Sequence, residues 1–510
     1  MKKFITTIVL ALCLILFLII FIDVVEPQKK ENGKDFVYSI PKVSYDLKSV
    51  GSLDKRMQDV VNATSRGLVE LNSNNEITPS LSENVEVKDD GLEYDFKLRN
   101  DIYWSDGTKI TPSDIATFFR EILTEEDEEN ISALLNVYGA KAYRGGSGSF
   151  SKDVGISYGE NNIVFRLNSK DDKFIEELTM PQYRLRKNVL LWEDINNNYS
   201  SLIYSGNYTI TNMSLSEINL KKNDYIDLNI VSNIKVIIDE GEEVAMAAFE
   251  IGERDIVINP PKSQLNRLND EGRLINLKAN KAMYLAFNPK DDRLQLEGRR
   301  EIYKLFNKAF ESYQLDNSLY IELAEGSYFR SDKEDLSKLQ ARKVMSAGET
   351  EWEKPEIIHL IAEESSENKE ISEYLVKWFE NNTNILLIYD LVKLSELEKI
   401  NQENYYDMAL ISGNLALTDE GSIYNDLVKF LDGEKREKFI SLKTEGERLE
   451  NFLNIEEELF NQYKILPLMF YNDNVAVNKK FKNMRLDGNG NIDFSKIENS
   501  AVAQWKIKNE

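Results

Sequence analysis

One stretch near the start of the folded region constrains the fold more than any other. Its first eight residues, Leu92–Arg99, alternate strictly between apolar and charged side chains, which is typical of a β-strand with one buried face. Asp106 and Gly107 then form a dipeptide that favours a turn with positive φ. Thr111 is a good N-cap, and Pro112 suits the first position of a helix. The sequence therefore predicts a strand, a turn and a capped helix.

The predicted helix has an apolar face. Ile115, Phe118, Phe119 and Ile122 recur at helical spacing, so we expect them to face a core. Trp104, just before the turn, is expected to be structural. Nothing in this stretch indicates catalytic chemistry.

The same stretch resembles the signature of a known family. The residues that carry the likeness are Tyr94, Phe96, Leu98, Arg99, the run Trp104–Thr108, Thr111 and Asp114. Their spacing is similar to that of the family 5 extracellular solute-binding proteins, which serve peptide and nickel importers of the ABC type. Further matches follow in the order of the family, at Ser52–Asp54, Arg66–Leu68, Ile77–Leu81, Tyr204–Tyr208, Lys222–Tyr225, Phe249–Asp255, Leu285–Asn288, Glu297–Phe310 and Leu466–Leu468.

The rest of the chain also predicts mixed α/β lobes, because strand patterns and helix patterns alternate throughout. Examples are a hairpin over Val154–Leu167, a strand and a helix over Ile234–Ile238 and Glu242–Glu250, and a helix and a strand over Ser366–Glu380 and Ile385–Tyr389. The family resemblance implies a two-lobed fold of the periplasmic-binding-protein kind (type II, cluster C) with an extra subdomain. It implies lobe I over 36–75, 166–280 and 470–510, the extra subdomain over 76–165, and lobe II over 281–469.

The composition excludes several classes of function. The chain has 87 acidic and 63 basic residues, a net charge of −24, and no basic block, so nucleic acid is not an expected partner. The acidic balance indicates solubility or, alternatively, a weak attraction for cationic ligands. One cysteine, Cys13, and one histidine, His359, exclude the usual zinc spacings. His359 lies in an apolar predicted strand, so we expect a buried core residue there, and no metal, cofactor or catalytic nucleophile.

The N-terminus is expected to tether the chain to the cell membrane. Two lysines precede an uncharged run, Phe4–Ile22, whose helix would span about 28 Å, close to the hydrocarbon thickness of a bilayer. The lysines favour a cytoplasmic N-terminus with the rest of the chain on the extracytoplasmic face. No small-residue cleavage site follows, so we expect an uncleaved anchor over residues 1–27 and a linker over residues 28–35. The alternative is a lipoprotein acylated at Cys13.

The resemblance also implies where a ligand would bind. Peptide-binding members hold the ligand's N-terminal ammonium with an aspartate in the second lobe. Here Leu417 stands at that position, and Asn414 replaces a tryptophan. Asp419 is either a shifted anchor or an ordinary solvated loop carboxylate, and the aromatic candidates could equally belong to a core. The expected ligand-binding residues are Gly413, Asn414, Asp419, Tyr424 and Tyr471.

These features lead to a leading hypothesis and three alternatives. We expect a monomeric, non-catalytic, membrane-tethered protein whose lobes close on short peptides and deliver them to ABC permease subunits. The missing aspartate leaves open that the same fold binds a sugar, an opine or a metal chelate. A membrane-tethered sensor or scaffold is a further alternative. A hydrolase with paired carboxylates is the enzyme alternative, although no spacing singles out such a pair.

Overall fold

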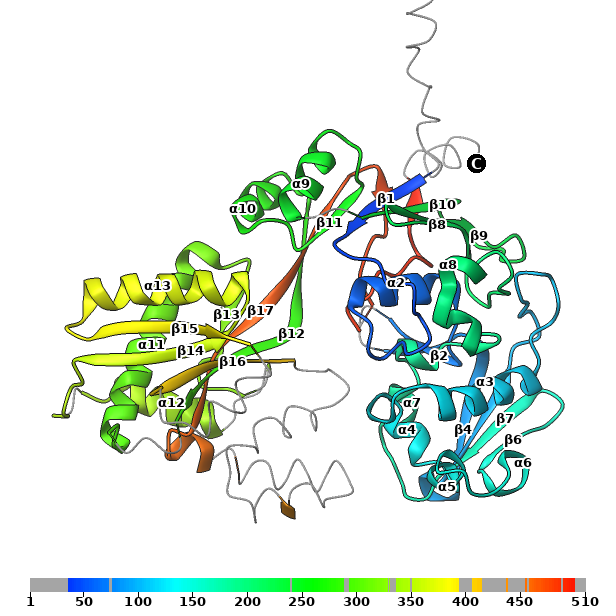
Figure 1. Cartoon of the computed structure of the whole chain (residues 1–510), viewed down its shortest axis with the longest axis horizontal. Coiled ribbons are helices and arrows are strands. Elements are labelled where there is room, and N and C mark those ends of the chain that lie inside the picture. Colours follow the sequence, from blue (N-terminus) through cyan, green and yellow to red (C-terminus); the bar gives the residue numbers. More distant parts are fainter. Residues whose placement is uncertain are drawn as a thin grey trace, which may run out of the picture.

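The structure is a computed structural model of the chain. It describes residues 35–499, except 73–75, 239–240, 289–292, 329, 331–335, 349–350, 394–405, 415–436, 439–454, 456–457 and 488. Within these ranges, no helix is long and apolar enough to cross a membrane. The predicted anchor, residues 1–27, lies outside the described residues, as do residues 28–34 of the predicted linker. Figure 1 shows two bodies connected at one end.

The right-hand body in Figure 1 contains two buried apolar clusters. The first cluster is surrounded by β1 (Asp35–Ile40), α2 (Lys55–Thr64), η4 (Val189–Asp194), α8 (Ile195–Asn198), β8 (Tyr208–Met213), β9 (Glu217–Lys222), β10 (Asn233–Ile238), β11 (Ile256–Ile258), β18 (Phe481–Lys482) and β19 (Glu498–Asn499). Strand β1 pairs in parallel with both β10 and β11. Phe36 and Tyr38 on β1 are fully buried in this cluster, so the first described strand is a core element.

The second cluster belongs to the stretch that the sequence singles out. Its elements are β2 (Val69–Leu71), β3 (Ile77–Pro79), β4 (Ser82–Lys88), η1 (Asp89–Gly91), β5 (Glu93–Leu98), α3 (Pro112–Glu125), η2 (Glu128–Asn130), α4 (Ser132–Leu135), α5 (Ala140–Arg144), α6 (Phe150–Asp153), β6 (Ile156–Tyr158), β7 (Asn162–Arg166), α7 (Phe174–Glu177) and η3 (Pro181–Tyr183). The predicted hairpin is confirmed as the antiparallel pair β6–β7. Tyr94, Phe96 and Leu98 on β5 are buried while Lys97 is exposed, which confirms the predicted alternation.

The predicted turn and helix cap are also confirmed. Gly107 has φ +82°, and a Cβ there would lie 2.6 Å from the Tyr225 ring. Thr111 caps α3 by accepting the backbone N–H of Asp114, and the Asp114 carboxylate accepts the backbone N–H of Thr111 at 2.9 Å. This reciprocal capping satisfies two backbone donors that a helix start otherwise leaves unpaired. The predicted structural residue Trp104 is buried.

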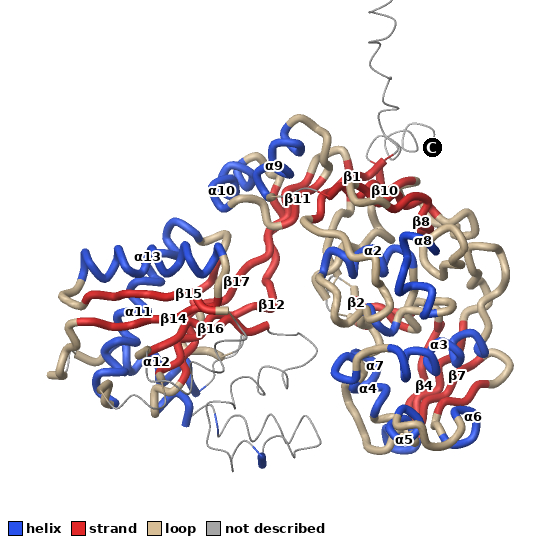
Figure 2. Tube along the Cα trace, viewed as in Figure 1, coloured by secondary structure: helices blue, strands red, loops and turns tan. Residues whose placement is uncertain are grey.

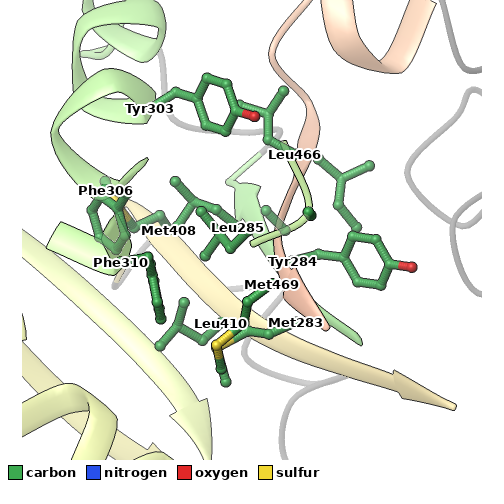
Figure 3. Close-up of a cluster of buried hydrophobic side chains, with 14 of the residues drawn as sticks. Met283, Tyr284, Leu285, Tyr303, Phe306, Phe310, Met408, Leu410, Leu466 and Met469 are labelled. Carbon is green, nitrogen blue, oxygen red and sulfur yellow. The ribbon is translucent and has the colours of Figure 1, made fainter. Parts of the chain in front are cut away.

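The left-hand body is built on the two longest strands of the structure. Its elements are β12 (Leu274–Phe287), α11 (Leu296–Asn317), β13 (Ile321–Leu323), α12 (Leu336–Ser346), β14 (Ile357–Glu363), α13 (Ser366–Asn382), β15 (Leu386–Val392), β16 (Met408–Asn414) and β17 (Ile465–Val477). On α11, Ile302, Phe306 and Phe310 recur four residues apart and are buried, as an amphipathic helix requires. Figure 3 shows Phe306 and Phe310 of this face beside Met408, in the same buried cluster as Met283 and Leu285 of β12.

Strands β12 and β17 connect the two bodies. They pair antiparallel from Leu274↔Ala476 to Ala286↔Ile465, with irregular register between Lys278 and Ala282. At one end β17 pairs with β11, and further along β12 pairs with β16, so Figure 2 shows both strands running from one body into the other. Within the described residues, a single sheet therefore runs through both bodies in the order β15-β14-β16-β12-β17-β11-β1-β10-β9-β8, with β13 attached to β17.

Two short helices occupy the junction between the bodies. They are α9 (Glu242–Glu250), at its predicted bounds, and α10 (Lys262–Asp270). Figure 1 shows both beside β11, where the crossing strands meet the right-hand body. Their buried residues Phe249 and Leu268 form a small separate cluster with Val257 and Ala476, so the junction has an apolar core of its own.

One sequence prediction is wrong: His359 is not a core residue. Its neighbours Ile358 and Leu360 are buried, whereas the His359 side chain is 25% exposed and its Nε2 lies 2.7 Å from Asp390 Oδ2 on β15. Successive side chains of a strand point to opposite faces. The apolar run misled the prediction because Ile357, on the same face as His359, is itself exposed.

Candidate functional site

The structure brings together three of the five predicted ligand-binding residues. Gly413 and Asn414 end β16, where they pair with Ala282 and Lys281 of β12. On the other side of β12, Ala282 pairs with Phe470, the neighbour of Tyr471 on β17. The backbones of these residues therefore lie on adjacent strands at the irregular part of β12. Asp419 and Tyr424, and Leu417 at the family's aspartate position, lie outside the described residues.

A polar cluster surrounds Tyr471. The Nζ of Lys281 lies 4.3 Å from the centroid of the Tyr471 ring and forms an ion pair with Glu367. Glu367, in the first turn of α13, also accepts a hydrogen bond from the Tyr320 hydroxyl. Burial, followed by the negative charge of Glu367, raises the pKa of Tyr471 well above its ordinary value. Tyr471 is thus a neutral, buried residue held beside a cation.

Helix α10 extends this polar cluster to the junction. Its first residue is Lys262, whose Nζ lies 2.9 Å from a carboxylate oxygen of Glu370 and 3.0 Å from the Tyr313 hydroxyl. The same Nζ lies 4.1 Å from the centroid of the Tyr320 ring. The contacts join α10 to α11 and α13, so charged and aromatic groups connect the junction to the left-hand body.

A pocket of about 290 Å³ lies in the right-hand body. Segments far apart in sequence line it: the end of α2, the β2–β3 hairpin, Arg184, Asn207 and the stretch from Arg485 to Lys496. Figure 1 shows α2 and the C-terminal stretch on the side of this body that faces the other body. The charged lining residues are Arg66, Glu70, Arg184, Arg485, Asp487, Asp493 and Lys496.

The carboxylates of the pocket already have partners. Glu70 lies 3.2 Å from Arg184 Nη1 and accepts a hydrogen bond from the Ser80 hydroxyl at 2.7 Å. Although burial opposes its ionisation, Arg184 and then Arg66 hold the pKa of Glu70 below its ordinary value. Asp493 lies 3.5 Å from Arg485. The pocket therefore contains ionised groups of both signs that are already paired.

Asp487 differs from the other carboxylates of the pocket. Its Oδ1 accepts the backbone N–H groups of Asn489 and Asn491, each at 2.9 Å. Burial nevertheless raises its pKa to about 6, with the hydrogen bond from Asn491 acting in the opposite direction. The charge of this carboxylate therefore changes in mildly acidic solution.

Sequence reasoning did not find this pocket. Of its charged residues, only Arg66 falls in a stretch quoted for the family resemblance. The others come from separate segments that no spacing along the chain connects. A short-range pattern could not have identified them, because their proximity depends on the fold.

Comparisons with known proteins agree with this architecture. The family described as "Bacterial extracellular solute-binding proteins, family 5 Middle" matches residues 76–312. The oligopeptide-binding protein OppA of Bacillus subtilis (strain 168) is 24% identical over 229 residues, which cover 42% of this chain and 42% of OppA. The matched stretch therefore spans less than half the length of that curated relative.

Two solved structures are similar over almost their whole length. OppA of Listeria monocytogenes, bound to peptide, has a TM-score of 0.63 at 15% identity, covering 92% of this chain and 100% of that one. NikA of Brucella suis, in complex with Fe(III)-EDTA, has a TM-score of 0.69 at 15% identity, covering 91% and 100%. Identities this low establish the fold alone.

The fold defines the class: it is a mixed α/β, two-lobed fold of the kind found in solved solute-binding proteins, as the sequence predicted. The family match and the curated relative narrow the likeness within that class. Over residues 76–312 the chain is similar to the bacterial extracellular solute-binding proteins of family 5, the family that the sequence motifs resemble.

Proposed function

We propose that this protein captures short peptides outside the cytoplasm and delivers them to the permease subunits of an ABC importer. The observation that carries the proposal is the pair of strands β12 and β17, which join two bodies and which lie beside three predicted ligand-binding residues. Two bodies on such a connection can rotate about it, and a ligand that contacts both favours the closed state. OppA of Bacillus subtilis, by its name an oligopeptide-binding protein, supports peptides as the solute.

The proposed lobes follow from the same connection. Lobe I would comprise residues 36–75, 166–280 and 470–510, with 76–165 as its extra subdomain, and lobe II residues 281–469. The apolar cluster around β12 and β17 supports this division, because its members run from Ala279 to Tyr471. The finer assignment to type II, cluster C, belongs to this proposal.

We also propose that residues 1–27 anchor the chain in the cell membrane, with the lobes on the extracytoplasmic face. The support is the uncharged run Phe4–Ile22 behind two lysines. Extraction of native membranes with alkaline carbonate should leave the full chain in the membrane and release a variant that lacks residues 2–27. Release of the full chain by carbonate would contradict anchoring.

Native mass spectrometry of the full chain, purified under mild conditions, tests the transport proposal. We expect the native spectra to show the protein with short peptides bound, and the peptides to be released when the protein is denatured. The proposal would be contradicted if the purified protein carried no ligand and also bound no tripeptide from an added mixture.

A second candidate solute is a metal complex of a polycarboxylate. It is favoured by Leu417 at the position of the ammonium-binding aspartate and by the arginines of the pocket. The same mass spectra distinguish it, because a released chelate carries the isotope pattern of its metal.

A further inference from the structure

The pocket of the right-hand body contains a buried donor without a partner. Arg184 is 7% exposed, and its Nη1 donates to the Ser65 carbonyl at 3.0 Å and to Glu70 at 3.2 Å. Its Nε is buried and has no hydrogen-bond partner among the described residues. Buried N–H groups are rarely left unpaired in native proteins, so this atom marks a place for an acceptor on a ligand.

A residue that lines the same pocket has an acceptor without a partner. In the part of the chain that the structure describes, Asn62 Oδ1 is likewise buried and unpaired. The backbone carbonyl of Asn62 accepts a hydrogen bond from Arg184 Nη1 at 3.5 Å, and both residues line the pocket. A solute that carries both a carboxylate and an N–H can therefore offer a partner to each of the two unpaired atoms.

The charges of the pocket also favour an anion. Four of its lining residues are basic and three are acidic. Among the acidic residues, Glu70 pairs with Arg184 and Asp493 lies beside Arg485, while Asp487 carries a full charge only above its pKa of about 6. Lys496 is exposed at the rim. A guanidinium is well suited to a carboxylate because its N–H groups match the spacing of the two oxygens.

Resting on the proposed function, we propose that this pocket is the subsite for a carboxylate of the solute, held by Arg184. The carboxylate can belong to the end of a peptide, to an acidic side chain or to a metal chelate. The volume of about 290 Å³ accommodates such a group rather than a whole oligopeptide.

Titration calorimetry of the full-length chain with matched probes tests the proposal. The probes are Ala-Glu-Ala and Ala-Gln-Ala, each as free acid and as C-terminal amide, and nickel citrate. We expect the tightest carboxylate-bearing probe to bind at least about tenfold more tightly than Ala-Gln-Ala amide, which has no carboxylate. Preference for the free acids, for the Glu side chain or for nickel citrate identifies the source of the group.

Variants with opposite expected effects make the test specific. The measured ratio is the affinity of the tightest carboxylate-bearing probe divided by that of Ala-Gln-Ala amide. Arg184→Gln should bring this ratio close to one, and Glu70→Gln should raise it because Arg184 then has one competitor fewer. Lys496→Gln should lower the ratio about twofold to fivefold. This variant replaces Arg184→Gln as the test of the subsite if Arg184→Gln does not fold. Arg267→Gln, an arginine outside the pocket that pairs with Glu250 and Glu271, should leave the ratio unchanged.

The outcomes separate the two proposals. Equal affinity for all probes, nickel citrate included, or a ratio that Arg184→Gln and Glu70→Gln both leave unchanged, would overturn the carboxylate subsite and leave solute binding intact. Binding of none of the probes, together with an empty protein in native mass spectra, would overturn both proposals.

Discussion

Asp419 is the residue on which the ammonium-anchor hypothesis depends. If its carboxylate holds the N-terminal ammonium of a peptide, Asp419→Ala should lower affinity at least tenfold, because a hydrogen bond to a charged group contributes about 1.5–3 kcal/mol. Calorimetry with a tripeptide and its N-acetylated form checks this, since the acetylated form should bind the variant and the parent equally. Glu420→Gln is the matched control. An unchanged affinity in Asp419→Ala would remove the residue from the site.

Asp487 should give the protein a pH-dependent component of stability. Its pKa is about 6 in the fold against an ordinary value of 3.8, so the folded state retains a proton that the unfolded state releases. The contribution of this group to stability therefore falls as the pH rises from about 4 through 6. Asp487→Asn keeps the Oδ1 acceptor and removes the charge. In urea unfolding, the variant should be more stable relative to the parent at pH 7 than at pH 4.5.

The surroundings of Asp487 define the control for that measurement. The charged groups that face it are Lys55 and Asp59 of α2 and Arg184. A difference between variant and parent that is the same at both pH values would contradict the raised pKa. Asp493→Asn provides the comparison, because Asp493 lies in the same stretch of chain beside Arg485.

At the scale of single residues, the sequence predicted backbone roles better than side-chain environments. The positive φ of Gly107 and the cap at Thr111 were predictable because they depend on neighbours in the chain. The partial exposure of His359 was not, because it depends on which face of β14 the rest of the fold covers. The partners of Arg184 are equally remote, with Ser65 and Glu70 more than 100 residues away.

The capped helix α3 carries a prediction at the scale of an element. Thr111→Ala removes the side-chain acceptor for the Asp114 backbone N–H and should lower stability by about 1 kcal/mol. Thermal unfolding followed by circular dichroism measures the shift. Ser113→Ala, which alters an exposed hydroxyl of the same helical turn, should produce a much smaller change. Equal shifts in the two variants would mean that the cap does not stabilise the helix.

The elements themselves were largely predictable, and their pairing was not. The alternation over β5 and the apolar spacing in α3 determine the type of each element. Helix α11 extends to Asn317, beyond the stretch Glu297–Phe310 that matches the family, because Tyr313 continues its buried face. Pairings such as β1 with β10 join residues some 200 positions apart. Only the resemblance to a known family indicated which distant segments come together in each lobe.

The whole molecule should become more compact when it binds its solute. Ligand that contacts both bodies favours their closure about β12 and β17, so the radius of gyration measured by small-angle X-ray scattering should fall. The measurement needs a solute that calorimetry has shown to bind, added at saturation. An unchanged radius with the solute bound would contradict closure and favour a sensor or scaffold.

The position of β17 has a consequence for how the protein is made. This strand lies between β12 and β11, yet it follows both in the sequence and is therefore made after them. Until then β12 and β11 expose open strand edges, which promote aggregation. The nascent chain should therefore depend on a holding chaperone until β17 has been made, and a chain that stops at residue 464 should collect in inclusion bodies rather than yield one folded half.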